Sequence, residues 1–272
     1  MMNQDLKNWM KQLPAFERMP LLFIGHGNPM NAVLDNEYRR SWQELGKCLV
    51  TPQAILCISA HWLTRGTAVT AMPNPKTIHD FGGFPKELFD QQYPASGNPD
   101  LANKIQQMSK SHQVSVDFDW GLDHGAWLVL KPMFPLANVP VLQLSLDYYQ
   151  PIQYHYELAK ELRQLREKGV LVVGSGNLVH NLGQMSVAGK VYDWALEFDQ
   201  QLAEIIRKGN DNEVLNFQKW GELSSLAHPT FDHLLPLFYV LGMKYADEQA
   251  LFFNETFDLG SVSMRSIVYA KE

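Results

Sequence analysis

The sequence predicts a single α/β domain over residues 1–272, with a mostly parallel central sheet flanked by helices. Three observations predict this fold class. Strand-like and helical segments alternate along the whole chain. Four of the strand-like segments are almost entirely apolar, which is typical of strands covered on both faces. No linker-like, repetitive or low-complexity stretch divides the 272 residues.

The expected strands are short runs rich in β-branched and other apolar residues. The near-continuously apolar runs are those that begin at residues 21, 54, 139 and 170. The last run alternates polar and apolar side chains, which indicates an edge or antiparallel strand. In chain order the runs are LLFIGHG (21–27), AILCISAHW (54–62), TAVTAM (67–72), HQVSVDFDW (112–120), VPVLQLSL (139–146), VLVVGSGN (170–177) and SVSMRSIVYA (261–270).

Helical patterns lie between these runs. The helix expected from residue 151 begins with a proline and ends before Gly169, a residue suited to a helix C-cap. The Pro/Gly-rich segment 71–99 is expected to be a long loop over one face of the sheet. The expected helices are Asn31–Leu49, Pro99–Lys110, Pro151–Lys168, Tyr192–Lys208 and His233–Tyr245.

The composition narrows the class of function. The formal net charge is −6, and no basic stripe favours nucleic-acid binding. No window approaches the ~18 apolar residues of a membrane span, and the charged first 20 residues indicate no secretory signal. Two cysteines without a CxxC pair suit a reducing compartment. We therefore expect a cytoplasmic protein that acts on a small molecule; oligomeric state has no signature in the sequence.

Three histidines stand at or just after the ends of expected strands. His26 ends the first run and His61 the second, and His180 follows the GSGN segment by three residues. Ligands of open α/β sheets bind outside the carboxyl ends of the strands, so these imidazoles are expected to converge there. Gly25 and Gly27 beside His26, and Gly174 and Gly176 in the GSGN segment, are expected to let the backbone come close to the ligand. A phosphate-binding turn at GSGN is the weaker alternative, because GxGxxG and a Walker lysine are absent.

Two further segments place histidines near expected helix starts. His124 follows Asp123 at the start of an apolar helix, and His233 lies near the start of another. A helix N-terminus lowers the pKa of an imidazole, which suits a metal ligand or a proton-transfer group. His228, five residues before His233, is as compatible with a helix-capping or surface residue as with a site residue.

Seven segments, taken together, resemble the DODA-type extradiol aromatic ring-opening dioxygenases of the class III extradiol superfamily. They are GHGNPMNA, ISAHW, HDFGGFP, YPASGNP, GLDHGAW, GSGNLVHNL and HPTFDHLLPL, in the order of the family and over nearly the full chain. The resemblance implies one α/β domain and one mononuclear non-haem metal. It also implies extradiol opening, with O2, of a catechol such as L-DOPA (4,5-cleavage).

The resemblance also implies roles for individual residues. His26, His61 and His233 resemble the family's metal ligands, and His180 resembles either a fourth ligand or an acid/base facing the substrate. His124 resembles a histidine that assists oxygen or proton handling, so His124 and His180 are the expected catalytic residues. The residues expected on the substrate side are Asn28, Phe81, Gly82, Gly83 and Asn177.

An all-histidine ligand set would differ from the usual two-His, one-carboxylate iron site. Asp232 is expected to point away from the centre, which would leave the ligands neutral and favour binding of a deprotonated diol. Imidazoles with an open position also suit zinc. We therefore expect Fe(II) for turnover and Zn(II) in the isolated protein.

Two other classes of function compete. A zinc hydrolase would need a carboxylate base near the metal, as in HExxH, and this motif is absent. A zinc-binding protein without catalysis, on the same fold, is the other alternative.

Overall fold

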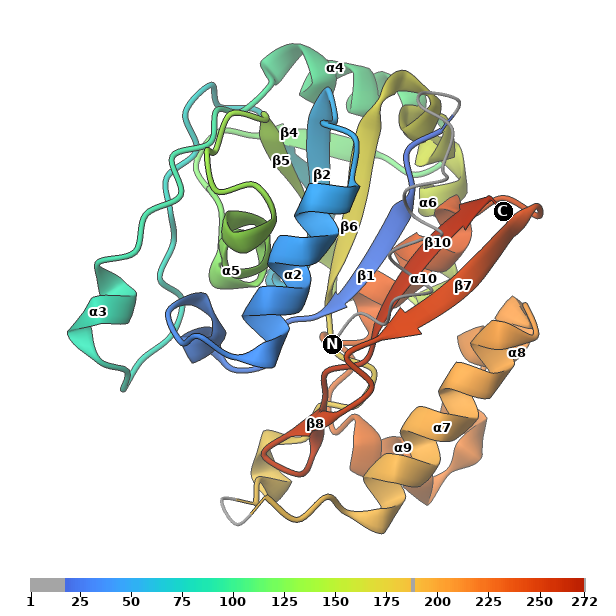
Figure 1. The fold of residues 1–272 in the computed structure, drawn as a ribbon. Helices are drawn as coiled ribbons and strands as arrows, with labels where there is room; N and C mark the ends of the chain where they lie inside the picture. Colours follow the sequence, from blue (N-terminus) through green and yellow to red (C-terminus); the bar gives the residue numbers. More distant parts are fainter. Residues whose placement is uncertain (1–17, 187–188, 272) are drawn as a thin grey trace.

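An eight-stranded sheet with helices on both faces forms the centre of the computed structural model, which describes residues 18–186 and 189–271 (Figure 1). The strand order is β4-β3-β5-β2-β6-β1-β10-β7. The four central strands β5, β2, β6 and β1 run parallel, while β10 and β7 are antiparallel to their neighbours. The strands are β1 (Leu21–Gly25), β2 (Ala54–Thr64), β3 (Thr67–Thr70), β4 (Val114–Asp117), β5 (Val141–Asp147), β6 (Val170–Gly176), β7 (Glu248–Phe253) and β10 (Ser266–Lys271).

The central strands are buried on both faces, and alternate side chains enter opposite cores. In β1, Phe23 belongs to one apolar cluster and Ile24 to the other. Helices α6 (Ile152–Leu162) and α10 (Leu235–Met243) cover the first face, and α2 (Glu37–Cys48) and α5 (His124–Met133) cover the second (Figure 1). Every residue of α10 is buried, as expected for a helix that is apolar all round. The predicted fold class is confirmed.

All seven runs predicted as strands contain one. The last, β10, is antiparallel as predicted, but it pairs on both sides and so is not an edge strand. The edge is β7, which the sequence analysis missed because its half-buried residues EQALFF lack a clear alternation. A separate two-stranded hairpin, β8 (Phe257–Asp258) with β9 (Val262–Ser263), precedes β10.

The helix boundaries differ from the prediction mainly at their starts. The sequence predicts a helix from Asn31 onward. Asn31 instead lies in a short 3-10 turn, η1 (Pro29–Ala32), and the α-helix α2 begins only after Asn36. The Asn36 side chain accepts a hydrogen bond from the backbone N–H of Arg39, which caps the helix at that point. The remaining helices are α3 (Lys86–Phe89), α4 (Pro99–Met108), η2 (Arg163–Lys168), η3 (Leu182–Gln184), α7 (Asp193–Arg207), α8 (Asp211–Leu215), η4 (Phe217–Trp220) and α9 (Glu222–Ala227).

The segment predicted as one helix from Pro151 to Lys168 is α6 followed by η2. Pro151 is the residue before the helix, not its first residue, and Gly169 ends the segment with φ 77°. This left-handed conformation explains the glycine and confirms its predicted capping role.

A bulge in β2 and the neighbouring ends of β1 and β6 create the position of the site. β2 pairs with β5 at Ile58↔Leu144 and next at Leu63↔Leu146, so its register shifts between these pairs. Bulges re-aim side chains and are common next to functional sites. On the other side of β6, Gly25 of β1 pairs with Gly176. The carboxyl ends of three strands therefore meet.

The glycines at these strand ends admit main-chain atoms of other segments. A Cβ on Gly25 would lie 2.7 Å from the carbonyl carbon of Met264, and a Cβ on Gly176 would lie 2.2 Å from the carbonyl oxygen of His233. The GSG segment is the end of β6, as the strand predicted over residues 170–177 implies, and the weaker alternative of a phosphate-binding turn is wrong. Close approach is therefore the reason for these glycines, and it brings His233 to the sheet.

Residues 1–17, on which the sequence predicts no signal peptide, lie outside the described residues. Within the described part of the chain, every helix is too short or too polar to cross a membrane.

Replacing Gly176 with alanine is expected to destabilise the protein by about 1–3 kcal/mol, because the new methyl group would displace the His233 main chain. Urea unfolding measures the change. Gly82→Ala is the matched control, since a Cβ there meets no atom within 4 Å, and its effect should stay within about 0.5 kcal/mol. Equal stability of the two variants would contradict this packing argument.

Candidate metal centre

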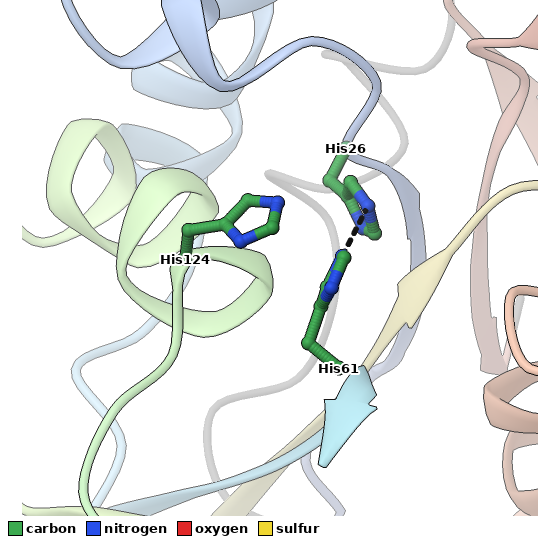
Figure 2. Close-up of side chains that lie close together, drawn as sticks. All are labelled: His26, His61 and His124. Atoms are coloured by element: carbon green, nitrogen blue, oxygen red, sulfur yellow. Dashed lines mark hydrogen bonds between the residues drawn. The ribbon is translucent and has the colours of Figure 1, made fainter. Parts of the chain in front are cut away.

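Histidines from distant parts of the chain converge at the carboxyl ends of the central strands. His26 directly follows β1, His61 lies in the bulged part of β2, and His124 is the first residue of α5. Figure 2 shows the side chains of these three residues close together. The Nε2 atoms of His26 and His61 lie 3.2 Å apart. Two groups of potential ligand atoms each lie within 4.8 Å of one another, namely His26, His61 and His124, and His180, Asp232 and His233.

Ser175 determines which nitrogen of His26 carries the proton. The Ser175 hydroxyl donates to the carbonyl oxygen of Gly125 at 2.5 Å, so its oxygen must accept the hydrogen bond from His26 Nδ1 at 3.0 Å. The proton therefore lies on Nδ1, and the lone pair of Nε2 faces His61. This tautomer is inferred from the hydrogen-bond partners.

Asp80 stands behind His61 and His124. Its Oδ2 lies 3.4 Å from His61 Nδ1 and 2.9 Å from His124 Nδ1, and its Oδ1 accepts from the His124 backbone N–H. Burial alone would raise the Asp80 pKa, but hydrogen bonding and attraction to His124 bring it below its ordinary value. An ionised carboxylate in this position favours the tautomers with Nδ1 protonated and leaves Nε2 free to bind a cation.

Asp232 plays the same part for His233. Its carboxylate accepts a hydrogen bond from His233 Nδ1. Burial opposes ionisation, yet this hydrogen bond and electrostatic attraction to the His233 ring hold the Asp232 pKa well below its usual range. The prediction that Asp232 points away from the centre is therefore wrong. The residue before His233 reaches back to its ring because the chain has not yet entered α10, which begins at Leu235.

His180 lies flat against His233, with ring centroids 3.4 Å apart and planes only 6° from parallel. An isolated bridge between His180 and Val262 holds its backbone. Burial, followed by electrostatic repulsion from the His233 ring, lowers the pKa of His180 to about 2, although Asp232 opposes this effect. The His180 ring is therefore neutral near pH 7.

The ring spacings test which imidazoles fit one ion. Three imidazoles around a tetrahedral ion, with metal–nitrogen bonds of about 2.0–2.1 Å, have ring centroids roughly 5.2 Å apart. The centroid distances among His26, His61 and His233 are 5.0, 5.2 and 5.0 Å. The 3.9 Å between His61 and His124 is too short for two ligands of one such ion. The ring spacing of His26, His61 and His233 therefore matches that of three ligands of one tetrahedral ion, whereas the ligand atoms that lie within 4.8 Å of one another are those of His26, His61 and His124.

Burial lowers the pKa values of His26 and His61 well below the ordinary value, and repulsion from the neighbouring imidazoles lowers them further. Protons therefore compete weakly for the two Nε2 atoms near neutral pH. Metal binding requires such neutral imidazoles.

Asp123 fixes the start of α5 and thereby the position of His124. Its buried carboxylate accepts hydrogen bonds from the Ala126 backbone N–H at 3.1 Å and from the Ser59 hydroxyl at 2.7 Å. Gln143 donates to its second oxygen at 2.7 Å. This network connects α5 with β2 and β5, so two of the converging histidines are held by one rigid group of side chains.

The histidines open into a pocket of about 300 Å³, within the range of small-molecule sites. Of the residues expected on the substrate side, Asn28 and Phe81 line it, whereas Gly82 and Asn177 do not. Gly82 is exposed, and Asn177 is fully buried, where its N–H donates to the carbonyl oxygen of His233. The lining residues are His26, Gly27, Asn28, Pro29, His61, Phe81, Phe84, His124, His180, Leu182, Met185, His233, Asp258, Leu259 and Val262.

His228 lies outside this pocket. It is 1% exposed and directly follows α9, and its Nε2 is 2.8 Å from the carbonyl oxygen of Leu178. The surface interpretation of His228 is therefore wrong, and the residue has a structural role.

Sequence reasoning missed the carboxylates of the site, namely Asp80, Asp232 as a partner of His233, and Asp258 in the pocket wall. Asp80 follows His79 in the HDFGGFP segment, whose only signal is its resemblance to the family. A search for carboxylates next to these histidine-bearing motifs would have found the first two, but Asp258 has no such signal.

Comparisons with known proteins agree with this geometry. Residues 21–261 match the family described as the catalytic LigB subunit of aromatic ring-opening dioxygenase. The 4,5-DOPA dioxygenase extradiol of Escherichia coli K12 is 45% identical over 92% of this chain and 94% of its own length, and that of Beta vulgaris is 37% identical over 90% and 94%. The crystal structure of an uncharacterised Escherichia coli K12 protein has a TM-score of 0.81 at 40% identity, covering 92% of this chain and 99% of that one.

Proposed function

The chain belongs to the family of the catalytic LigB subunit of aromatic ring-opening dioxygenases and is an extradiol ring-cleaving dioxygenase, and from this we propose that it opens a catechol such as L-DOPA by 4,5-cleavage with O2. The names of the relatives from Escherichia coli and Beta vulgaris support this substrate. The observation that carries the proposal is the set of converging imidazoles at one end of a pocket of about 300 Å³.

The proposed ligands are His26, His61 and His233, with Fe(II) for turnover and Zn(II) in the isolated protein. These three imidazoles would hold the ion, which would supply Lewis-acid and electron-transfer chemistry to the diol and O2. The spacing of the three rings supports this choice. His180, stacked at 3.4 Å on His233, is too close to that ring to share a tetrahedral ion with it.

His180 is the proposed acid/base. Its neutral ring lines the pocket and can accept a proton from a catechol hydroxyl. The low pKa of this ring would rise when a deprotonated diol arrives, because the anion stabilises an imidazolium. His124, held by Asp80 on the other side of the pocket, is proposed to donate a proton during O–O cleavage.

Asp80 and Asp232 change the expected charge of the centre. The sequence predicted a neutral set of ligands, but two carboxylates contact the outer nitrogens of these imidazoles. They raise the basicity of the ligands and offset part of the cation's charge. The diol would therefore bind next to a centre that is less positive than three isolated imidazoles would leave it.

The ligand set is tested by metal content. The variants to compare are His26→Ala, His61→Ala and His233→Ala. Each should lower the apparent zinc affinity of the refolded or zinc-soaked protein at least tenfold, and with it the bound zinc, because metal affinity depends on each ligand. His124→Ala should retain bound zinc. His112→Ala, which changes a histidine paired with Glu161 outside the pocket, is the control. Loss of zinc in His124→Ala with retention in His233→Ala would contradict the assignment.

The reaction is tested by ferrous reconstitution followed by a catechol panel with oxygen-uptake measurements. Wild type should consume O2 and form a yellow ring-opened product, and His180→Ala should be about a hundredfold slower or more at unchanged iron content, since it loses proton transfer. Wild-type turnover by His180→Ala would remove its proposed role. Ester or amide cleavage without oxygen uptake would instead favour a zinc hydrolase, and no reaction at all a non-catalytic metal-binding protein.

A further inference from the structure

A tight hairpin forms part of the wall of the pocket that Phe81 also lines. β8 and β9 pair at Phe257↔Ser263 and Asp258↔Val262, and both Asp258 and Val262 line the pocket. The bend between them places Leu259 at φ 51°, a conformation that is costly for a residue with a Cβ. Strain of this kind persists where the surrounding structure requires it. Here it brings the Asp258 carboxylate and the Leu259 side chain to the pocket.

Asp258 is the only carboxylate among the fifteen lining residues, and none of the fifteen is a lysine or arginine. Among the described residues, Asp258 makes no ion pair with any basic side chain at 4.0 Å or less. Burial raises the Asp258 pKa, and hydrogen bonds from the backbone N–H groups of Asn28 and Leu259 oppose that rise. These two donors hold an acidic group in the wall of an otherwise apolar pocket.

The remaining walls provide little polarity for a substrate substituent. Phe81 and Phe84 lie on one side of the pocket, and Leu182, Met185 and Leu259 add apolar side chains. A ring whose two hydroxyls face the histidines must direct its other substituent toward these walls or toward the opening. Among the fifteen lining residues, a carboxylate there would meet the Asp258 carboxylate and no lysine or arginine, whereas an ammonium group would meet an opposite charge.

We infer that Asp258 is a specificity-determining residue that binds a positively charged amino group on the substrate, so that the pocket selects cationic over anionic catechols. This inference rests on the proposed function and names the substrate class of the same site. An amino acid such as L-DOPA fits when its ammonium faces Asp258 and its carboxylate faces solvent. A catechol with an acidic side chain brings like charges together in a half-buried site.

The test compares dopamine, the neutral 4-methylcatechol and the anionic 3,4-dihydroxyphenylacetate on the iron-loaded enzyme. For wild type, kcat/KM should be at least tenfold higher with dopamine than with 3,4-dihydroxyphenylacetate, and added salt should reduce this ratio. Asp258→Asn retains an oxygen that can accept the two backbone hydrogen bonds. It should lower kcat/KM for dopamine about tenfold or more, raise it for the anion, and leave 4-methylcatechol within about twofold.

Two controls make the result specific. Asp119→Asn, an exposed change of the same chemistry outside the pocket, should leave all three values unchanged. Asp258→Glu should restore part of the preference for dopamine. Because the three substrates are compared within each variant, a lower content of folded enzyme cancels from the ratios.

Equal losses on all three catechols in Asp258→Asn, or a wild-type enzyme that is indifferent to substrate charge, would overturn the inference. Absence of turnover with every catechol, the neutral one included, would overturn the proposed function instead. In that case, calorimetric titration of the zinc-loaded protein with dopamine and with 3,4-dihydroxyphenylacetate still decides the role of Asp258. Tighter binding of dopamine, lost in Asp258→Asn, supports the inference, and equal binding refutes it.

Discussion

The site depends on which groups contact Nδ1, the nitrogen of each imidazole that faces away from the proposed ion, because these contacts decide which nitrogen carries the proton. The Ser175 hydroxyl oxygen accepts a hydrogen bond from His26 Nδ1, and the Asp232 carboxylate accepts one from His233 Nδ1. The Asp80 carboxylate faces His61 Nδ1. The hydrogen bonds with Ser175 and Asp232 keep a proton on Nδ1 of His26 and His233, and the Asp80 carboxylate, 3.4 Å from His61 Nδ1, favours the same tautomer there. Burial and the neighbouring imidazoles lower the pKa values of His26 and His61, and a divalent cation is a group that these nitrogens and that of His233 can bind together.

The fold supplies this arrangement by several small deviations from regular structure. The bulge in β2 re-aims His61, and Gly176 lets the His233 main chain touch the end of β6. Asp123 ties the start of α5 to β2 and β5. Because each deviation is packed against a central strand of the sheet, the imidazoles are held before any ion or substrate arrives. Such preorganisation lowers the cost of binding.

Much of this could be predicted from the sequence, and the reasons are physical. Apolar runs identified the central strands, and the rule that ligands bind at strand ends brought His26 and His61 together before any coordinates. His233 came from the family resemblance, because its position depends on how a loop approaches β6. The contact of Asp232 with His233, the stack of His180 and the place of Asp258 depend on tertiary packing and have no local sequence signal. The edge strand β7 was missed because its burial pattern is weak.

The central claim is that His26, His61 and His233 bind one ion through Nε2 while His124 and His180 remain unbound. A crystal structure of the zinc-soaked protein, with the ion located by its anomalous scattering, tests this most directly. The account predicts one zinc ion with three Nε2 atoms at about 2.0–2.1 Å, from those three residues. An ion bound by His124 in place of His233, or bound through Asp232 or Asp80, would contradict it.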